Sequence, residues 1–197
     1  MTPRLPRLVL ASGSPRRREL LTGLDLDFTV RATDLDESLV AGETAREHVE
    51  RLAAAKSAAS TTTDELVLAA DTVVVIEDEI LGKPADDGAA RRMLTRLAGR
   101  RHTVLTGVAV RLGGSHRHVV GTETSEVEIA AMSRAEIDWY VATREPIDKA
   151  GSYAIQGLGA LFVVAVSGNY TNVVGLPLPL TRALFSRLGF DLLQFRR

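Results

Sequence analysis

The sequence of 197 residues contains no cysteine, and aromatic residues make up 5% of it. Without cysteine there is no disulfide, thiol nucleophile or thiolate metal ligand, which fits a reducing cytoplasm. So few aromatic side chains disfavour a stacking platform for single-stranded nucleic acid. The net charge of −1 gives no electrostatic reason to expect a nucleic acid or a membrane surface as partner. We therefore expect a cytoplasmic protein.

Long hydrophobic runs and internal divisions are also lacking. The apolar run at residues 8–11 stops at polar residues, too early for a signal-peptide core or a membrane span. Hydrophobic residues at 45% and charged residues at 25% are ordinary for a globular protein. Because no repeat, low-complexity tract or linker divides the chain, we expect a single α/β domain over residues 1–197.

Helix and strand signals interleave along the chain. Residues 8–11 predict a short buried strand, followed by a helix with Ser14 as N-cap and Pro15 in its first turn. Ser/Thr-x-x-Glu capping boxes at Thr44 and Ser133 begin two more helices. Hairpin patterns are mixed in, as at residues 65–81. We predict a mixed β-sheet with flanking helices rather than a purely parallel sheet.

Three consecutive arginines, Arg16 to Arg18, stand where the first helix begins. The first turn of a helix carries the positive end of its dipole, so cations there are disfavoured unless an anion completes the site. A strand, a Ser/Gly turn and a helix N-terminus cradle phosphate, and arginine adds a planar fork of donors. Consecutive helical residues fan out, so we expect Arg16 and Arg17 to face the ligand and Arg18 the surface. The alternative is a solvated charge run.

Asp71 interrupts a nearly continuous apolar strand. A carboxylate there is costly unless it is paired, hydrogen-bonded or bound to a metal. One interpretation is a strand-end residue that caps a neighbouring loop. The other is a ligand of a divalent cation or a residue that orients a water molecule.

An acidic loop and two lysines add weaker signals. Glu37 lies in the loop sequence TDLDES, and hard oxygen ligands on a loop suit magnesium, although such loops are usually just solvated. Lys83 follows a glycine in a tight turn within reach of a phosphate, whereas Lys56 near a helix end equally suits the helix dipole. Together these patterns indicate a protein that binds a phosphorylated ligand with magnesium.

The motifs LASGSPRRREL, AADTVV, LGKP, DKAGSYAIQG and VVGLPL, in this order, resemble the Maf family of nucleoside triphosphate pyrophosphatases. The resemblance covers nearly the whole chain. It implies a fold similar to inosine triphosphate pyrophosphatases, with two lobes around a cleft that holds the active site. It also implies hydrolysis of a nucleoside triphosphate to the monophosphate and pyrophosphate, a divalent cation (Mg²⁺ or Mn²⁺) and a homodimer.

The resemblance also assigns roles by motif. Asp71 matches the catalytic aspartate that accepts a proton from the attacking water. Glu37, with Asp71, would hold the metal. The residues that would bind the substrate lie along the whole chain: Ser12, Arg16, Arg17, Lys56, Thr72, Lys83 and Gln156.

Three positions distinguish two branches of this family. Arg16, Thr72 and Gln156 resemble the branch that acts on dTTP and UTP, whereas the 7-methyl-GTP branch typically has Trp, Gln and Glu there. Gln156 offers both a donor and an acceptor, which a uracil or thymine edge requires. We therefore expect a metal-dependent dTTP/UTP pyrophosphatase that also accepts some modified pyrimidine triphosphates.

Two other functions remain open from the sequence. A nucleotide sensor that acts on cell division through a partner would bind a nucleotide without releasing pyrophosphate. A nucleic-acid-binding module is disfavoured by the near-neutral charge.

Overall fold

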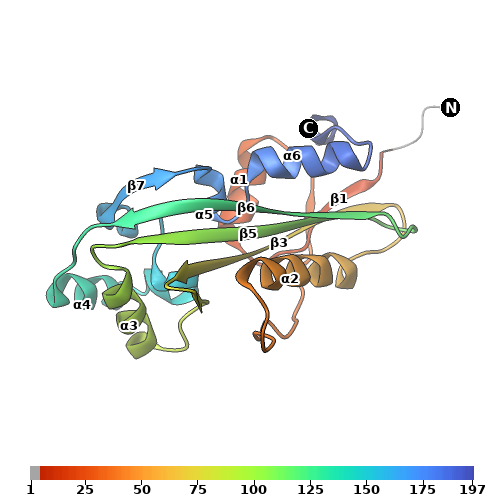
Figure 1. Ribbon diagram of the computed structural model, residues 1–197. Helices are drawn as coiled ribbons and strands as arrows, with labels where there is room; N and C mark the ends of the chain where they lie inside the picture. The colour runs from red at the N-terminus through yellow and green to blue at the C-terminus, as the bar shows by residue number, and fades with distance from the viewer. Residues whose placement is uncertain (1–4) are drawn as a thin grey trace. The chain divides into compact units, whose positions relative to one another are not determined.

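The computed structural model describes residues 5–197 and contains a sheet of seven strands (Figure 1). The strand order is β2-β1-β3-β5-β6-β7, and β4 pairs with β3. β1 is parallel to both β2 and β3, whereas the β3–β4 and β6–β7 pairs are antiparallel. The prediction of a mixed sheet is therefore confirmed. The strands are β1 (Arg7–Leu10), β2 (Thr29–Val30), β3 (Glu65–Ile76), β4 (Glu79–Leu81), β5 (Arg101–Leu112), β6 (His118–Ile129) and β7 (Val163–Ser167).

Helices flank the sheet, and the predicted helix starts are confirmed. Ser14 is the N-cap of the first helix, with proline in its first turn, and Thr44 and Ser133 form complete capping boxes. The α-helices are α1 (Pro15–Gly23), α2 (Ala45–Ala59), α3 (Asp87–Leu97), α4 (Arg134–Ala142), α5 (Tyr170–Val174) and α6 (Leu178–Arg187). Short 3₁₀ helices are η1 (Glu145–Asp148), η2 (Ala150–Ser152), η3 (Leu158–Phe162) and η4 (Leu192–Phe195).

The chain forms two compact units. Unit 1 comprises residues 1–71, 106–123 and 175–197, and unit 2 comprises residues 72–105 and 124–174. Neither unit is a continuous segment, because the chain passes from one to the other four times. That both units belong to one domain stays a prediction.

Unit 1 is organised by the alternation of side chains along β1 and β3. Leu66, Leu68 and Ala70 of β3 belong to the larger core, together with Leu184 and Phe185 of α6. Figure 1 shows α6 and α2 on opposite faces of these strands. Both faces of β3 are therefore covered, which explains its nearly continuous apolar sequence.

The second face of β1 and β3 leads directly to Asp71. Val67 and Ala69 of β3 pack with Val9 and Ala11 in a small separate core. Because strand side chains alternate with a period of two, Asp71 continues the row of Val67 and Ala69. The strand therefore directs Asp71 to the face that α2 covers.

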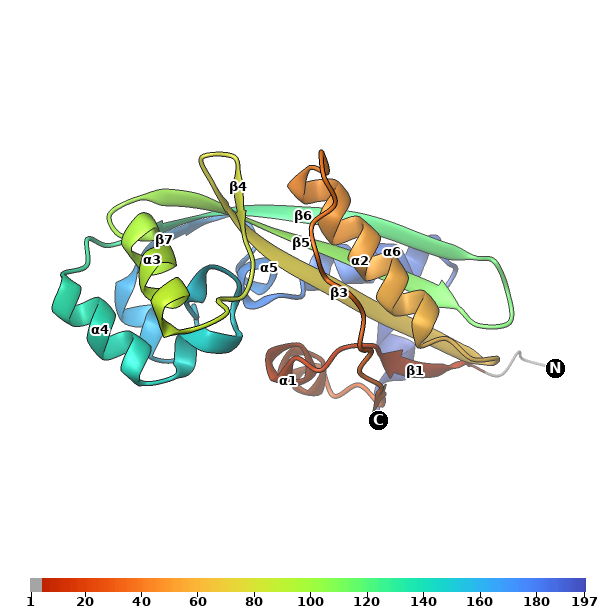
Figure 2. The same cartoon turned by 90° about the horizontal axis from the view of Figure 1, so that it is seen from below.

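Helix α2 packs very closely on this face. A methyl group built on Gly107 of β5 would overlap the backbone carbonyl of Val49 in α2. A glycine at this position lets the helix backbone approach the strand. Figure 2 shows α2 running along β3. Lys56, in the last turn of this helix, contacts Asp71 of that strand.

Unit 2 has its own apolar core. α3 and α4 pack side by side, and the core includes Leu94, Leu97, Ile137, Tyr140 and Val141 from these two helices. The apolar run at residues 160–166 predicts a strand from the sequence alone, and the start of this prediction is wrong: residues 160–162 lie in η3, and β7 begins at Val163. Gly157, with a φ of 85°, precedes η3 and turns the chain before the strand.

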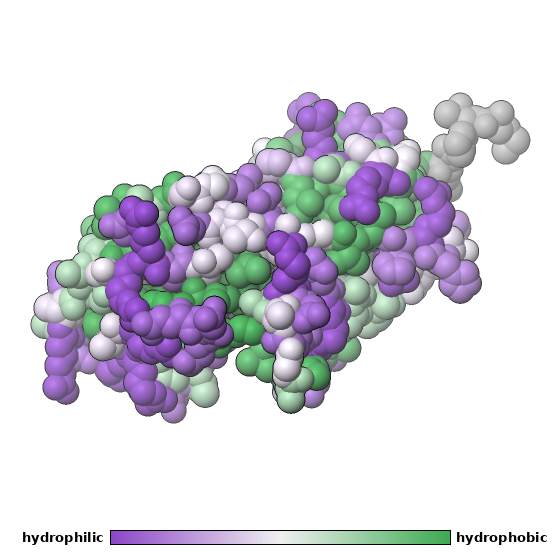
Figure 3. Space-filling view, in the orientation of Figure 1, coloured by the Kyte–Doolittle hydropathy of each residue, from purple (hydrophilic) through white to green (hydrophobic). Residues whose placement is uncertain are grey.

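Hydrophilic side chains spread over much of the face in Figure 3, with smaller hydrophobic areas between them. Within residues 5–197, no helix has the length and apolar character needed to cross a membrane.

Candidate active site

The Ser/Gly turn before α1 is held by the hydroxyl of Ser12. Its Oγ accepts hydrogen bonds from the backbone N–H of Ser14, at 3.2 Å, and from Nη1 of Arg17, at 3.1 Å. Arg18 is exposed, as predicted, and Arg16 is half-buried. The turn thus presents a helix N-terminus with a guanidinium beneath it, an arrangement that suits an anion.

Arg17 is buried, because it shares the inward face of α1 with Leu21 one turn later. Its Nε donates to the carbonyl of Gly175 and its Nη1 to the carbonyl of Ala70, each at 2.7 Å. Burial lowers the pKa of Arg17, and attraction to Asp71 opposes that effect. Arg17 therefore ties the turn to β3 and to the segment before α6, and it brings positive charge to Asp71.

Asp71, Lys56 and Glu37 form a charged cluster in unit 1. The ammonium nitrogen of Lys56 lies 2.7 Å from Oδ1 of Asp71 and 2.6 Å from Oε1 of Glu37. Lys56 and Asp71 are buried, whereas the Glu37 side chain is 41% exposed. One lysine thus joins the buried aspartate of β3 to the acidic loop, and three of the sequence-based candidates of unit 1 lie together.

The loop that carries Glu37 is anchored by residues that the sequence analysis missed. Nη2 of Arg51, in α2, donates to the carbonyl of Ser38 at 3.1 Å, and its Nε donates to Glu43 at 2.6 Å. This bond from Arg51 is the main cause that lowers the pKa of Glu43 to about 2. Arg51 carries no local sign of this role in the sequence, because the folded loop before α2 brings its partners Ser38 and Glu43 close to it.

The carboxylates of this cluster fit a magnesium ion. Within the described part of the chain, no group of three or more His, Cys, Asp or Glu side chains is arranged as a metal site. Magnesium, however, is commonly bound by one or two carboxylates, with water and substrate phosphates completing its shell. Glu37 and Asp71 meet this requirement, since both lie within contact distance of the same ammonium group.

The other three candidates belong to unit 2. Thr72 is half-buried in β3, Lys83 is exposed in the turn after β4, and Gln156 is exposed between η2 and η3. The N–H of Gly151 donates to the carbonyl of Gly82 at 3.1 Å, which joins the Lys83 turn to the segment before Gln156. Unit 2 therefore connects the segments of Lys83 and Gln156 through the backbone.

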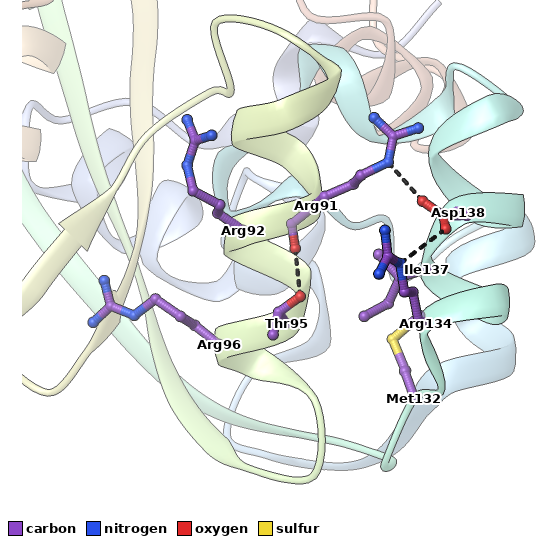
Figure 4. A pocket seen from close by; sticks show the side chains of 8 residues that line it. All are labelled: Arg91, Arg92, Thr95, Arg96, Met132, Arg134, Ile137 and Asp138. Carbon is purple, nitrogen blue, oxygen red and sulfur yellow. Dashed lines mark hydrogen bonds and ion pairs between the residues drawn. The ribbon is translucent and has the colours of Figure 1, made fainter.

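A hollow of about 640 Å³ between α3 and α4 is distinct from these residues (Figure 4). Met132 and Ile137 line it, together with several arginines. Nε of Arg91 contacts Asp138 at 2.7 Å, and Nη1 of Arg96 contacts Glu79 at 2.5 Å. Carboxylates accompany these two arginines, and none of the predicted site residues lines the hollow.

Comparisons with known proteins show the family to which the chain belongs. The model of the family described as Maf-like protein matches residues 7–188, and the chain belongs to this family. A dTTP/UTP pyrophosphatase of Anaeromyxobacter dehalogenans (strain 2CP-C) is 55% identical over 192 residues, which cover 95% of this chain and 96% of that protein. A dTTP/UTP pyrophosphatase of Myxococcus xanthus (strain DK1622) is 52% identical over 187 residues, 94% of each chain.

Among solved structures, the Ham1 protein of Staphylococcus aureus matches with a TM-score of 0.47 and 17% identity. That match covers 92% of this chain and 90% of the other. The family membership expected from the motifs is confirmed by the family match and by the relatives.

Proposed function

We propose that this protein hydrolyses dTTP and UTP to the monophosphate and pyrophosphate. Similarity to dTTP/UTP pyrophosphatases over 95% of the chain confirms the branch expected from the sequence. The structural observation that carries the proposal is the buried pair of Asp71 and Lys56 beside Glu37. A buried carboxylate that faces a basic turn suits water activation next to a polyphosphate.

In this mechanism Asp71 accepts a proton from the water that attacks the α-phosphorus. The bond from water oxygen to phosphorus forms as the bond to the bridging oxygen breaks, and pyrophosphate leaves. Lys56, 2.7 Å from Asp71, holds the carboxylate in one orientation. A fixed orientation matters because a general base works within hydrogen-bond distance of the proton it removes.

Glu37 and Asp71 would hold the divalent cation, Mg²⁺ or Mn²⁺. Such an ion supplies neutralisation of the negative charge on the phosphate oxygens. That these two residues bind it is part of the proposal. Its support is that both carboxylates contact one ammonium group, so both already face a site for positive charge.

The triphosphate would bind at the turn before α1. Ser12, Arg16 and Arg17 bring hydroxyl and guanidinium groups to the helix N-terminus, which favours anions. Arg17 acts mainly through the turn, since its bonds to Gly175, Ala70 and Ser12 fix the position of the backbone. Arg16 and Lys83 are the cations proposed to contact the phosphates themselves.

Gln156 would read the base and Thr72 would line its site. The amide of Gln156 supplies one donor and one acceptor, as a uracil or thymine edge requires. Its exposure between η2 and η3 leaves the amide accessible to a ligand.

A panel of nucleotides tests the function. The purified protein is incubated with magnesium and dTTP, UTP, CTP, GTP or 7-methyl-GTP, and pyrophosphate and monophosphate are measured. We expect release mainly from dTTP and UTP. Cleavage mainly of 7-methyl-GTP would contradict the branch, whereas tight binding without release would favour the nucleotide sensor. Modified pyrimidine triphosphates added to the panel test the broader substrate range.

A further inference from the structure

Two residues outside the predicted site, one in α4 and one in η1, hold the segment that carries Gln156 on both of its sides. Tyr140 lies in α4 and is fully buried, and Glu145 begins η1. The N–H of Ala154, two residues before Gln156, donates to the Tyr140 hydroxyl at 3.0 Å. The N–H of Leu158, two residues after Gln156, donates to Oε2 of Glu145 at 3.0 Å.

The two holding residues are joined to each other. The Tyr140 hydroxyl donates to Oε1 of Glu145 at 2.8 Å, and the same oxygen accepts the N–H of Gly159 at 2.9 Å. Burial raises the pKa of Glu145, but the N–H groups of Leu158 and Gly159 and the Tyr140 hydroxyl outweigh that effect and lower it. The ionised carboxylate of Glu145 therefore accepts hydrogen bonds from three donors, two backbone N–H groups and the Tyr140 hydroxyl.

The position of Glu145 is itself fixed by its backbone. Its N–H donates to Oγ1 of Thr143 at 3.2 Å, and its carbonyl accepts from Nζ of Lys149 at 2.6 Å. A methyl group built on Gly157 would overlap Oε2 of Glu145. The carboxylate of Glu145 thus lies directly beside Gly157, the residue that follows Gln156. Only glycine leaves room for this close approach of the carboxylate to the backbone.

We propose that Tyr140 and Glu145 are positioning residues that hold Gln156 where it reads the pyrimidine base. The proposal rests on the proposed function and on the role of Gln156 in it. Three hydrogen bonds fix the backbone on both sides of Gln156, and a fourth joins the two side chains that accept them, so the amide of Gln156 samples fewer positions before the substrate binds. Preorganisation of this kind strengthens binding because less conformational freedom is lost on association.

Tyr140→Phe tests the proposal with little change in volume. It removes the acceptor of the Ala154 N–H and one donor to Glu145. We expect KM for UTP to rise about tenfold, the effect of one lost hydrogen bond, with kcat nearly unchanged. Tyr170→Phe makes the same chemical change on an exposed tyrosine of α5 and should leave both constants unchanged.

Glu145→Gln is the second variant. Both carboxylate oxygens accept N–H groups, so an amide directs its NH₂ against a donor in either orientation. We expect a rise in KM at least as large as that of Tyr140→Phe. Inorganic tripolyphosphate, which lacks a base, should inhibit all variants with an inhibition constant within about twofold of the wild type.

A double-mutant cycle separates positioning from a general structural role. If Tyr140 acts through Gln156, the rise in KM caused by Tyr140→Phe disappears in a Gln156→Ala background. Additive effects, or weaker tripolyphosphate inhibition in Tyr140→Phe and Glu145→Gln, would overturn the proposal. Unchanged KM in both variants, while Gln156→Ala alone weakens UTP binding, would overturn it and leave the pyrophosphatase function intact. Absence of turnover by the wild type would instead contradict the proposed function.

Discussion

Arg17, Lys56 and Asp71 are among the buried charged side chains of unit 1, and each has polar or oppositely charged groups close to it. Lys56 contacts Asp71 and Glu37, while Arg17 donates to two backbone carbonyls and a hydroxyl. Removing one partner from such a group typically costs about 3–5 kcal/mol, because it leaves a charge buried without compensation. The cluster, which is the proposed site of the chemistry, therefore also helps to hold α1, α2 and β3 together.

Among single residues, buried His102 should make the free energy of unfolding depend on pH. Its ring is buried in unit 2, with Nε2 2.7 Å from the Tyr153 hydroxyl. Burial lowers the pKa of His102 from 6.5 to about 4. Between these values the unfolded chain binds the proton and the folded chain does not. The contribution of neutral His102 to the free energy of unfolding is thus fully present above pH 6.5 and is lost as the pH falls toward 4.

Urea unfolding at pH 7 and at pH 5 measures this effect. The wild type should lose about 2 kcal/mol between the two, and His102→Gln should lose much less. Keeping the pH at or above 5 avoids most of the titration of Glu43 and Glu65, whose pKa values of about 2 matter in more acidic solution. An equal loss in wild type and variant would show that His102 is not the group responsible.

Candidate site residues stood out in the sequence where their local context was unusual. Asp71 stands out in an apolar strand and the arginines stand out at a helix start, and the structure brings Asp71 and Arg17 together in unit 1. Arg51, Tyr140 and Glu145 were missed because their roles depend on partners that other elements bring close. An arginine in a helix or a tyrosine on a packed face carries no local sign of such a role.

At the element scale, the packing of α2 on β5 yields a stability prediction. Gly107→Ala places a methyl group against the backbone of Val49, which has no flexible end to move. We expect a loss of about 1–3 kcal/mol, measured by thermal or urea unfolding. Lower activity should accompany it, since α2 carries Lys56.

Gly121→Ala in β6 is the matched control. Its methyl group would meet the ends of Leu180 and Leu184, at 3.2 Å and 3.4 Å, and these side chains are able to adjust. A loss for Gly107→Ala no larger than that for Gly121→Ala would contradict the close contact between α2 and β5.

Elements were predicted well where a local signal marks their ends. The capping boxes at Thr44 and Ser133 and the proline after Ser14 gave the helix starts of α2, α4 and α1. The short 3₁₀ helices were not predicted. In the segment before β7, the apolar residues 160–162 are compatible with a strand and with a 3₁₀ helix, so their sequence does not distinguish the two. Gly157 and the hydrogen bonds from the backbone to Glu145 fix the helical conformation.

At the scale of the whole molecule, the sequence predicted the mixed sheet, and the strand order came from the structure. Each unit consists of segments distant in sequence, which local patterns do not reveal. The homodimer implied by the family resemblance stays a prediction, and light scattering tests it against the monomer mass of 21.2 kDa. The cytoplasmic location also stays a prediction, tested by fractionation of cells.

The proposed mechanism depends above all on Asp71, which activates water for release of pyrophosphate. The most direct measurement compares the wild type with Asp71→Asn on dTTP and magnesium, with circular dichroism as the check of folding and Asp78→Asn, on the exposed β3–β4 turn, as control. We expect the wild type and Asp78→Asn to release monophosphate and pyrophosphate in equal amounts. The rate of release by folded Asp71→Asn should fall by about a hundredfold or more. Release at the wild-type rate by Asp71→Asn would show that Asp71 is not the general base.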